Sequence, residues 1–195
     1  MKLLNKHILA AILFIMFTVS GCGGKEGVQY FYINEDTDFS FIKRVAVLPL
    51  DNLTNEKFAA DTVRHVVISE LLALNLVEVV IPGDAVSAIE KLKLRPGQPL
   101  SADEIKAIGK TLKVQAVILG AVDKYGEIRE GNVSAQEVAI TLMMADANSG
   151  SIIWSVTETS GGASFMAKHF GARSPTMSET VIDVVRKALK TLYEY

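Results

Sequence analysis

Strands and helices alternate along this chain, because its hydrophobic positions switch between continuous runs and a helical period. Residues 44–50 (RVAVLPL) form an almost wholly apolar run, typical of a buried strand. From 56 to 74 the apolar residues recur on one face of a predicted helix. The opposite face of that helix carries Lys57, Asp61, Arg64 and His65. Residues 76–81 (LVEVVI) follow as a second strand, and this order predicts a right-handed parallel crossover.

Two further helices and a central strand are predicted in the middle of the chain. Asp84 follows a Pro-Gly break and is placed to cap a helix that runs to about Lys93. Ser101 and Glu104 have the spacing of a capping box, which predicts a short helix after them. Residues 114–122 (VQAVILGAV) are the most hydrophobic segment beyond the N-terminal region, and we expect them to form the central strand.

A hairpin and a last helix complete the predicted fold. Residues 136–146 and 152–159 alternate between apolar and polar positions, with an Asn-Ser-Gly turn between them. In the second of these strands the alternation places three residues on one face, Ile152, Trp154 and Val156. Residues 124–135 form a short charged connection, and Thr176 with Glu179 opens the last helix. The fold class is therefore α/β (α+β mixed), a single mixed sheet of about five strands flanked by about four helices.

The N-terminus has the layout of a bacterial secretory signal peptide. Lys2 and Lys6 precede an apolar run of about twelve residues, and small residues then lead to Cys22, the only cysteine. This pattern resembles the lipoprotein lipobox, in which the cysteine is acylated with fatty acids such as palmitate and becomes the first mature residue. A plain signal peptide and an uncleaved helix are the alternatives, although the run is short for a bilayer. Gly23 follows the cysteine where an aspartate would signal inner-membrane retention, which favours the outer membrane.

These patterns predict three regions along the chain. Residues 1–21 are the signal peptide, 22–42 hold the acylated cysteine and a short tether, and 43–195 form one globular α/β domain. The signal peptide removes two lysines, so the mature chain has 18 basic against 22 acidic residues. A basic stripe with interleaved aromatic residues is absent from the sequence, so we predict no nucleic-acid partner.

Three stretches together carry a resemblance to a known group of proteins. They are residues 44–54 (RVAVLPLDNLT), residues 116–126 (AVILGAVDKYG) and residues 145–155 (ADANSGSIIWS). The chain from 42 to 195 resembles the bacterial envelope family of the curli secretion channel lipoprotein, the penicillin-binding-protein activator lipoproteins and the N-terminal domain of TolB. Its closest likeness is to the small lipoproteins of this group. The resemblance implies a mixed sheet flanked by helices, no catalysis, and a role in envelope assembly through protein contacts.

The histidines do not form a convincing catalytic or metal site. His65 follows Asp61 by one helical turn, so a solvated pair is favoured over a catalytic dyad. His169 lies in a glycine-bearing loop, and its spacing to the nearby serines supplies no positioned nucleophile. Two histidines on separate elements, with no free thiol, make a poor zinc site. We therefore predict no enzymatic activity, no metal and no cofactor, with a hydrolase as the least favoured reading.

Three segments are candidates for binding. The aromatic triplet Tyr30, Phe31 and Tyr32 either docks a partner or packs on the domain that it precedes. The loop at 160–175 is about sixteen residues long, and such loops are uncommon in a compact domain unless functional or disordered. Four of its residues either contact a partner or tuck onto the body, namely Phe165, Met166, His169 and Phe170. Asp51 and Asn52 either bind a ligand at the carboxyl edge of the sheet or cap the next helix.

The sequence thus predicts a non-enzymatic lipoprotein on the periplasmic face of the outer membrane. Its expected role is that of an assembly or accessory component of a cell-envelope or secretion complex, acting through envelope protein partners and open to homo-oligomer formation. The alternative is a binding lipoprotein for a small molecule or peptidoglycan fragment, using the sheet edge near Asp51.

Overall fold

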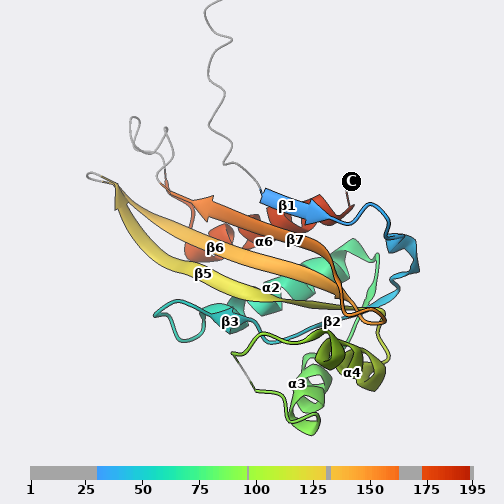
Figure 1. Ribbon diagram of the computed structural model, residues 1–195. Helices are drawn as coiled ribbons and strands as arrows, with labels where there is room; N and C mark the ends of the chain where they lie inside the picture. The colour runs from blue at the N-terminus through green and yellow to red at the C-terminus, as the bar shows by residue number, and fades with distance from the viewer. Residues whose placement is uncertain (1–29, 96, 131–132, 163–172, 194–195) are drawn as a thin grey trace, which may run out of the picture.

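The fold is built on one mixed sheet (Figure 1). This computed structural model describes residues 30–95, 97–130, 133–162 and 173–193. The strands run in the order β1-β7-β6-β5-β2-β4, and β3 pairs with β5 outside this path. The strands are β1 (Tyr30–Ile33), β2 (Arg44–Val47), β3 (Asp51–Asn52), β4 (Glu78–Val79), β5 (Ala116–Glu130), β6 (Val133–Asp146) and β7 (Ile152–Gly161). The helices are the 3-10 turn η1 (Phe39–Phe41), α2 (Ala59–Leu74), α3 (Pro82–Lys91), α4 (Ala102–Leu112) and α6 (Met177–Tyr193).

The predicted fold class is confirmed, and the described part of the sheet has seven strands where about five were expected. The two additional strands are short and come from segments predicted to be irregular. β1 lies within the predicted tether, and it pairs with β7 in antiparallel fashion. β3 follows the first long strand, and its Asp51 and Asn52 pair in parallel with Ala121 and Val122 of β5. β2 pairs in parallel with both β4 and β5, as expected for a crossover.

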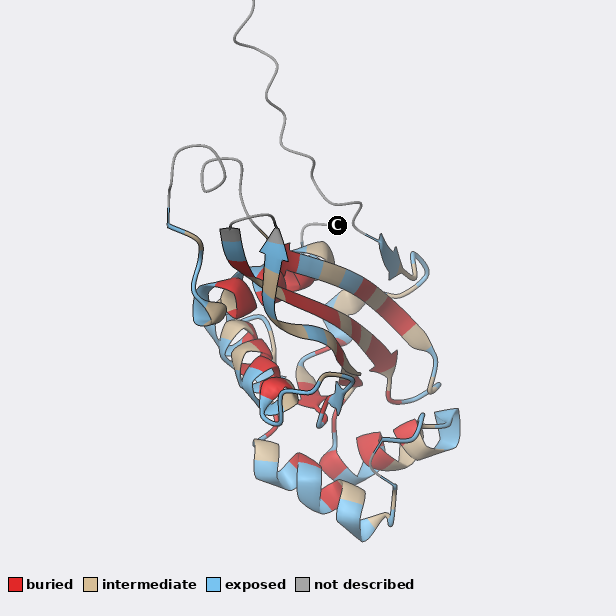
Figure 2. Ribbon diagram, turned by 90° about the vertical axis from the view of Figure 1, so that its left-hand side faces the viewer, coloured by how far each residue is buried: buried red, intermediate tan, exposed pale blue. Residues whose placement is uncertain are grey.

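The helices cover the two faces of the sheet unequally. α2 and α6 pack on one face over the larger of two hydrophobic clusters, which includes Trp154, Ile140, Leu142 and Leu189. α3 and α4 pack on the other face near β2 and β5, over a smaller cluster that contains Ala46 and Val117. Figure 2 shows α2 and α6 along one side of the sheet and α3 and α4 only at its lower end. The upper part of the second face therefore has no helix from the described residues against it.

The helix starts divide into those set by local hydrogen bonds and those set by packing. The capping box at Ser101 is confirmed, because the backbone N–H of Ser101 donates to Glu104 Oε2 at 2.7 Å and Glu104 N–H donates to Ser101 Oγ at 3.3 Å. The prediction that Asp84 caps α3 is wrong, because the helix begins at Pro82, with Asp84 inside its first turn. Proline suits the first helical position, where no N–H is needed.

The predicted polar face of α2 contains one error. Arg64 is only 6% exposed, although it was assigned to the solvent face. Its guanidinium donates to the carbonyl oxygen of Val47 at 2.8 Å and of Pro82 at 3.4 Å. Burial lowers the pKa of Arg64. The side chain thus ties α2 to the end of β2 and the start of α3, whereas His65 is exposed as expected.

The strand boundaries also differ from the prediction. β4 has two residues instead of six, because only Glu78 and Val79 pair with β2. The segment expected as a short charged connection, 124–135, mostly continues β5 and β6, which pair from Ala116 with Asp146 to Glu130 with Val133. The register of β6 and β7 shifts next to Trp154, so Ile152 packs with the smaller cluster and not beside Trp154.

The capping box of α6 makes the stability of the helix depend on pH. Glu179 accepts hydrogen bonds from Thr176 and from the Arg173 guanidinium at 2.7 Å, and these lower its pKa to about 2. A depressed carboxyl pKa contributes stability above the unfolded value of about 4.3 and loses it as the pH falls toward 2. We expect Glu179→Gln to lower the melting temperature near pH 6 and to match the parent near pH 2, measured by circular dichroism. An equal difference at both pH values would contradict this.

Candidate partner-binding face

One surface of the sheet is left open, and we call it the open face. On β7, Trp154 and Val156 point into the cluster under α6, so the alternating residues Ser155 and Thr157 point to the other side. The strand register then brings further residues of β1, β5 and β6 beside them. These residues are Tyr30, Tyr32, Leu119, Ala121, Lys124, Glu137, Ala139, Thr141, Met143 and Thr159.

Hydroxyl groups form the centre of the open face. Thr141 Oγ1 lies 2.8 Å from Asp123 Oδ2, to which it donates, and 3.1 Å from Thr157 Oγ1. Asp123 reaches this side because the register of β5 and β6 shifts between Val122 and Lys124. Thr157 is exposed, and Thr141 is half-buried. The network therefore links β5, β6 and β7 into a polar surface whose threonines still face the solvent.

Aromatic and charged groups border the hydroxyls. Tyr30 lies opposite Thr157 and Tyr32 opposite Ser155, and the two tyrosines are 72% and 52% exposed. Lys124 Nζ lies 3.5 Å from Glu137 Oε2, which forms an ion pair on the same face. Tyrosine and methionine are enriched at protein interfaces, whereas lysine, glutamate, aspartate, serine and alanine are depleted. The exposed tyrosines and Met143 are therefore the residues of the open face whose types favour a protein contact.

The predicted aromatic strip forms β1, and its docking of a partner stays a prediction. The triplet joins the domain as β1, but Tyr30 and Tyr32 stay exposed. Phe31 pairs with Val156 on the α6 side and is 46% exposed. Cys22, Phe165, Met166, His169 and Phe170 lie outside the described residues.

Asp51 and Asn52, the predicted ligand edge, form β3, and the Asn52 side chain is hydrogen-bonded within the loop that follows. Asn52 Oδ1 accepts from the backbone N–H and the hydroxyl of Thr54, and its amide nitrogen donates to the carbonyl of Glu56 at 2.8 Å. The Asn52 side chain therefore shapes the loop before α2, and α2 itself begins at Ala59, later than the predicted 56. These bonds use both ends of the amide that a ligand would need.

Two hollows lie away from the open face. An apolar one of about 310 Å³ opens between η1 and the C-terminal ends of α2 and α6, with Phe39, Leu74 and Leu192 in its wall. A more polar one of about 370 Å³ lies beside the start of α6 and includes Arg173 and Asp183. Within the described ranges no three His, Cys, Asp or Glu side chains gather in a way that would hold a metal ion. Nor does any described helix have the length and hydrophobicity of a membrane span.

Sequence reasoning did not find the open face as a site. Its residues come from four strands, and the pairing of β1 with β7 could not be read from the local pattern. One signal was available. In β6 and β7, Thr141, Met143, Thr157 and Thr159 alternate with the core positions, which indicates a sheet face without a full hydrophobic cover.

Comparison with solved structures supports the fold. A PelC dodecamer from Paraburkholderia phytofirmans is 19% identical, with a TM-score of 0.59 over 85% of this chain and 98% of that one. Lipoprotein GNA1162 from Neisseria meningitidis is 16% identical, with a TM-score of 0.50 over 76% of this chain and 99% of that one. The C-terminal domain of LpoB from Salmonella enterica is 20% identical, with a TM-score of 0.45 over 60% of this chain and 81% of that one. The support comes from the first two, with TM-scores of 0.50 or above, and at these identities it concerns the fold alone.

Comparison by sequence identifies the family. No curated protein matches the chain. The family model described as peptidoglycan-synthase activator LpoB matches residues 28–159, which is more than half of the chain. This match agrees with the predicted resemblance to a group of bacterial envelope lipoproteins, and it gives the activator lipoproteins where the sequence resemblance lay nearest the small lipoproteins of the group. The chain belongs to the peptidoglycan-synthase activator LpoB family.

Proposed function

We propose that this protein is a non-enzymatic accessory lipoprotein of the outer membrane that binds a peptidoglycan synthase from the periplasmic side. The family match over 28–159 supports the class of partner. The lipobox-like pattern before Cys22 supports acylation, and Gly23 after it supports the outer membrane. The single structural observation that carries the proposal is the open face.

The open face suits a protein partner better than the other surfaces do. It is broad and continuous over β7, β6 and β5, where it offers hydroxyls, and the tyrosines of β1 lie at its border. Such groups bind a partner without first losing a strongly held water shell, as a lysine or glutamate would. The opposite face of the sheet is already covered by α2 and α6.

The alternative functions have less support. A small-molecule site at the sheet edge would need Asn52, whose amide is already hydrogen-bonded within its own loop. A hydrolase would need a nucleophile beside a base, and among the described residues His65 is an exposed helix residue. A role in secretion, and a closer relation to the curli channel or TolB, rest on the sequence resemblance alone. Activation of a synthase therefore remains our proposal.

A charge placed on the open face should weaken partner binding. Thr157→Lys puts an ammonium at the centre of this face, where a partner would have to strip it of water. We expect the affinity for the peptidoglycan synthase of the same organism to fall by roughly ten-fold or more. The measurement is the dissociation constant by interferometry, together with the glycan polymerisation rate of the synthase with and without the lipoprotein.

Ser69→Lys is the matched control, because Ser69 is an exposed hydroxyl residue on α2, across the sheet from the open face. It should bind and activate like the parent. If Thr157→Lys retains full affinity, or if Ser69→Lys loses as much, the open face is not the synthase-binding surface. Equal melting temperatures of the two variants would show that both are folded.

Self-association is a second part of the proposal. The similar PelC structure is a dodecamer, and a closed ring of one fold uses two different surfaces of each copy. We expect the acylated protein in mild detergent to have a native mass of several chains by light scattering. A Cys22→Ala version, which lacks the anchor, should keep that mass if protein contacts hold the assembly together. A monomer in both forms would contradict self-association.

A further inference from the structure

The edge of the sheet nearest the proposed anchor carries exposed aromatic residues. Tyr30 follows Cys22 by eight residues, and eight residues of fully extended chain span at most roughly 28 Å. β1 is the outermost strand of the order β1-β7-β6-β5-β2-β4. If the chain is anchored at Cys22, β1 is therefore the part of the described domain held closest to the lipid.

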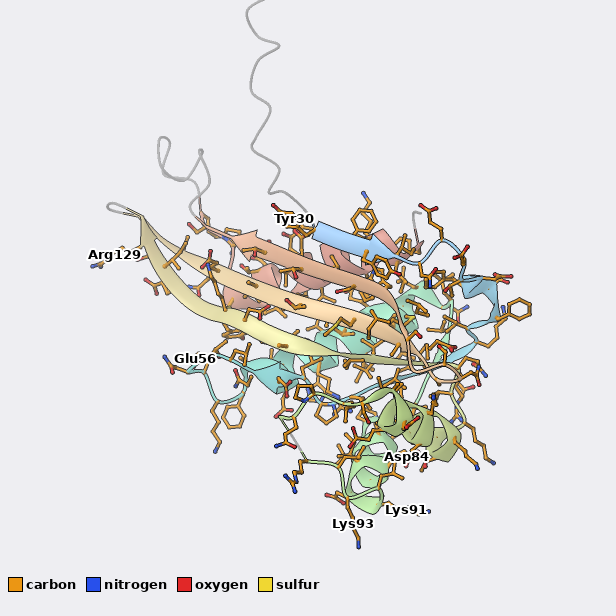
Figure 3. All side chains as sticks on the ribbon, viewed as in Figure 1. Tyr30, Glu56, Asp84, Lys91, Lys93 and Arg129 are labelled. Carbon is orange, nitrogen blue, oxygen red and sulfur yellow. The ribbon has the colours of Figure 1, made fainter. Side chains whose placement is uncertain are left out.

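The two tyrosines of β1 project from this edge. Tyr30 is 72% and Tyr32 is 52% exposed, and their strand neighbours on β7 are the small residues Thr157 and Ser155. Small neighbours leave the rings uncovered. Figure 3 shows Tyr30 at one side of the sheet, with Asp84 and Lys91 of α3, and Lys93 just after this helix, at the far end.

We infer that Tyr30 and Tyr32 form a seat in the lipid headgroup region of the membrane that holds the anchor. The inference rests on the proposed acylation of Cys22. Tyrosine collects at membrane interfaces, because its ring prefers the apolar side and its hydroxyl prefers water or headgroups. The seat places β1 and the adjoining border of the open face against the bilayer, and it leaves the part of the open face around Thr141 and Asp123 for the periplasm.

The tether length favours lipid over a protein as the occupant of this edge. A folded domain of about 100 residues has a radius of gyration of roughly 13 Å. It would therefore fill most of the roughly 28 Å that residues 22–30 can span. A partner inserted between β1 and the bilayer would need this tether at nearly full stretch. Partner binding instead fits the part of the open face farther from β1, around Thr141 and Asp123.

Depth-dependent quenching tests the seat. The acylated Tyr30→Trp protein is placed in vesicles of phosphatidylethanolamine and phosphatidylglycerol with bromine near the headgroup end of the acyl chains. We expect its added tryptophan emission to shift to shorter wavelength and to fall roughly two-fold. The native Trp154 is fully buried and provides an internal reference that stays unquenched.

Phe58→Trp is the matched control. Phe58 is 66% exposed and lies beside Glu56, which Figure 3 shows beyond β5 from β1. The control should show neither shift nor quenching.

Three outcomes would overturn the seat. An acylated Tyr30→Trp protein that stays on vesicles but remains unquenched would overturn it and leave the anchor intact. If lipid alone leaves this tryptophan unquenched and only added synthase protects it from solvent, the edge belongs to the protein partner instead. If the mass of the purified protein shows no acyl chains on Cys22, the anchor and the seat fail together.

Discussion

Replacing Trp154 with alanine is expected to cost about 3–5 kcal/mol of the free energy of unfolding. The side chain is fully buried on β7, opposite Met144 of β6 and Ile33 of β1. Its indole N–H donates to Thr191 Oγ1 of α6 at 2.9 Å. One residue therefore fills the space between three strands and the last helix. Truncation leaves a large cavity and removes one partner of the Thr191 hydroxyl, which still donates to the carbonyl of Ala188.

The measurement is urea unfolding followed by far-ultraviolet circular dichroism, since the variant lacks tryptophan fluorescence. Trp154→Phe is the graded control. It keeps an aromatic ring but removes the hydrogen bond to Thr191, so we expect a smaller loss of about 1–2 kcal/mol. A loss below about 1 kcal/mol for Trp154→Ala would mean that α6 does not depend on this contact for its position.

Replacing Gly120 with valine should cost about 2–5 kcal/mol, the sum of overpacking and backbone strain. Gly120 lies in the middle of β5 with a φ of +154°, and a Cβ added there would lie 2.0 Å from the carbonyl oxygen of Thr141. Leu142 Cα would lie 3.0 Å away. Both contacts are to the backbone of β6, so no side-chain rotation can relieve them.

Gly126 provides a control on the same strand. A Cβ at Gly126 would meet nothing within 4 Å, so Gly126→Val should be neutral or slightly stabilising in the same urea titration. If Gly120→Val does not accumulate as soluble protein, Gly120→Ala makes the same contacts with fewer atoms and is the variant to titrate. Equal stabilities of the Gly120 and Gly126 variants would contradict the close approach of β5 and β6.

The features that sequence predicted well are those decided within a few residues. The capping boxes at Ser101 and Thr176 need only a hydroxyl and a carboxylate three positions later, and both formed where expected. The alternation in β6 also identified its buried side, because period two holds wherever a strand faces a core.

The features that sequence did not predict depend on distant partners. Arg64 looks like a solvent residue until the carbonyls of Val47 and Pro82 are brought to it by the crossover. Residues 124–135 carry charges, a pattern that predicts a connection. They instead extend β5 and β6, and two strands can pair without a buried hydrophobic face. The open face depends on which strands pair with one another, and the hydrophobic period of a single strand does not reveal its partners.

β1 also sets the length of the tether between the domain and its proposed anchor. Only four residues, Tyr30 to Ile33, pair with β7. A pull on Cys22 would load this short ladder before any other part of the sheet. If β1 separated from β7, residues 30–41 would lengthen the connection to the anchor by up to roughly 40 Å. An anchored copy that lost this pairing would stand farther from the membrane, so the pairing of β1 with β7 sets the shorter distance.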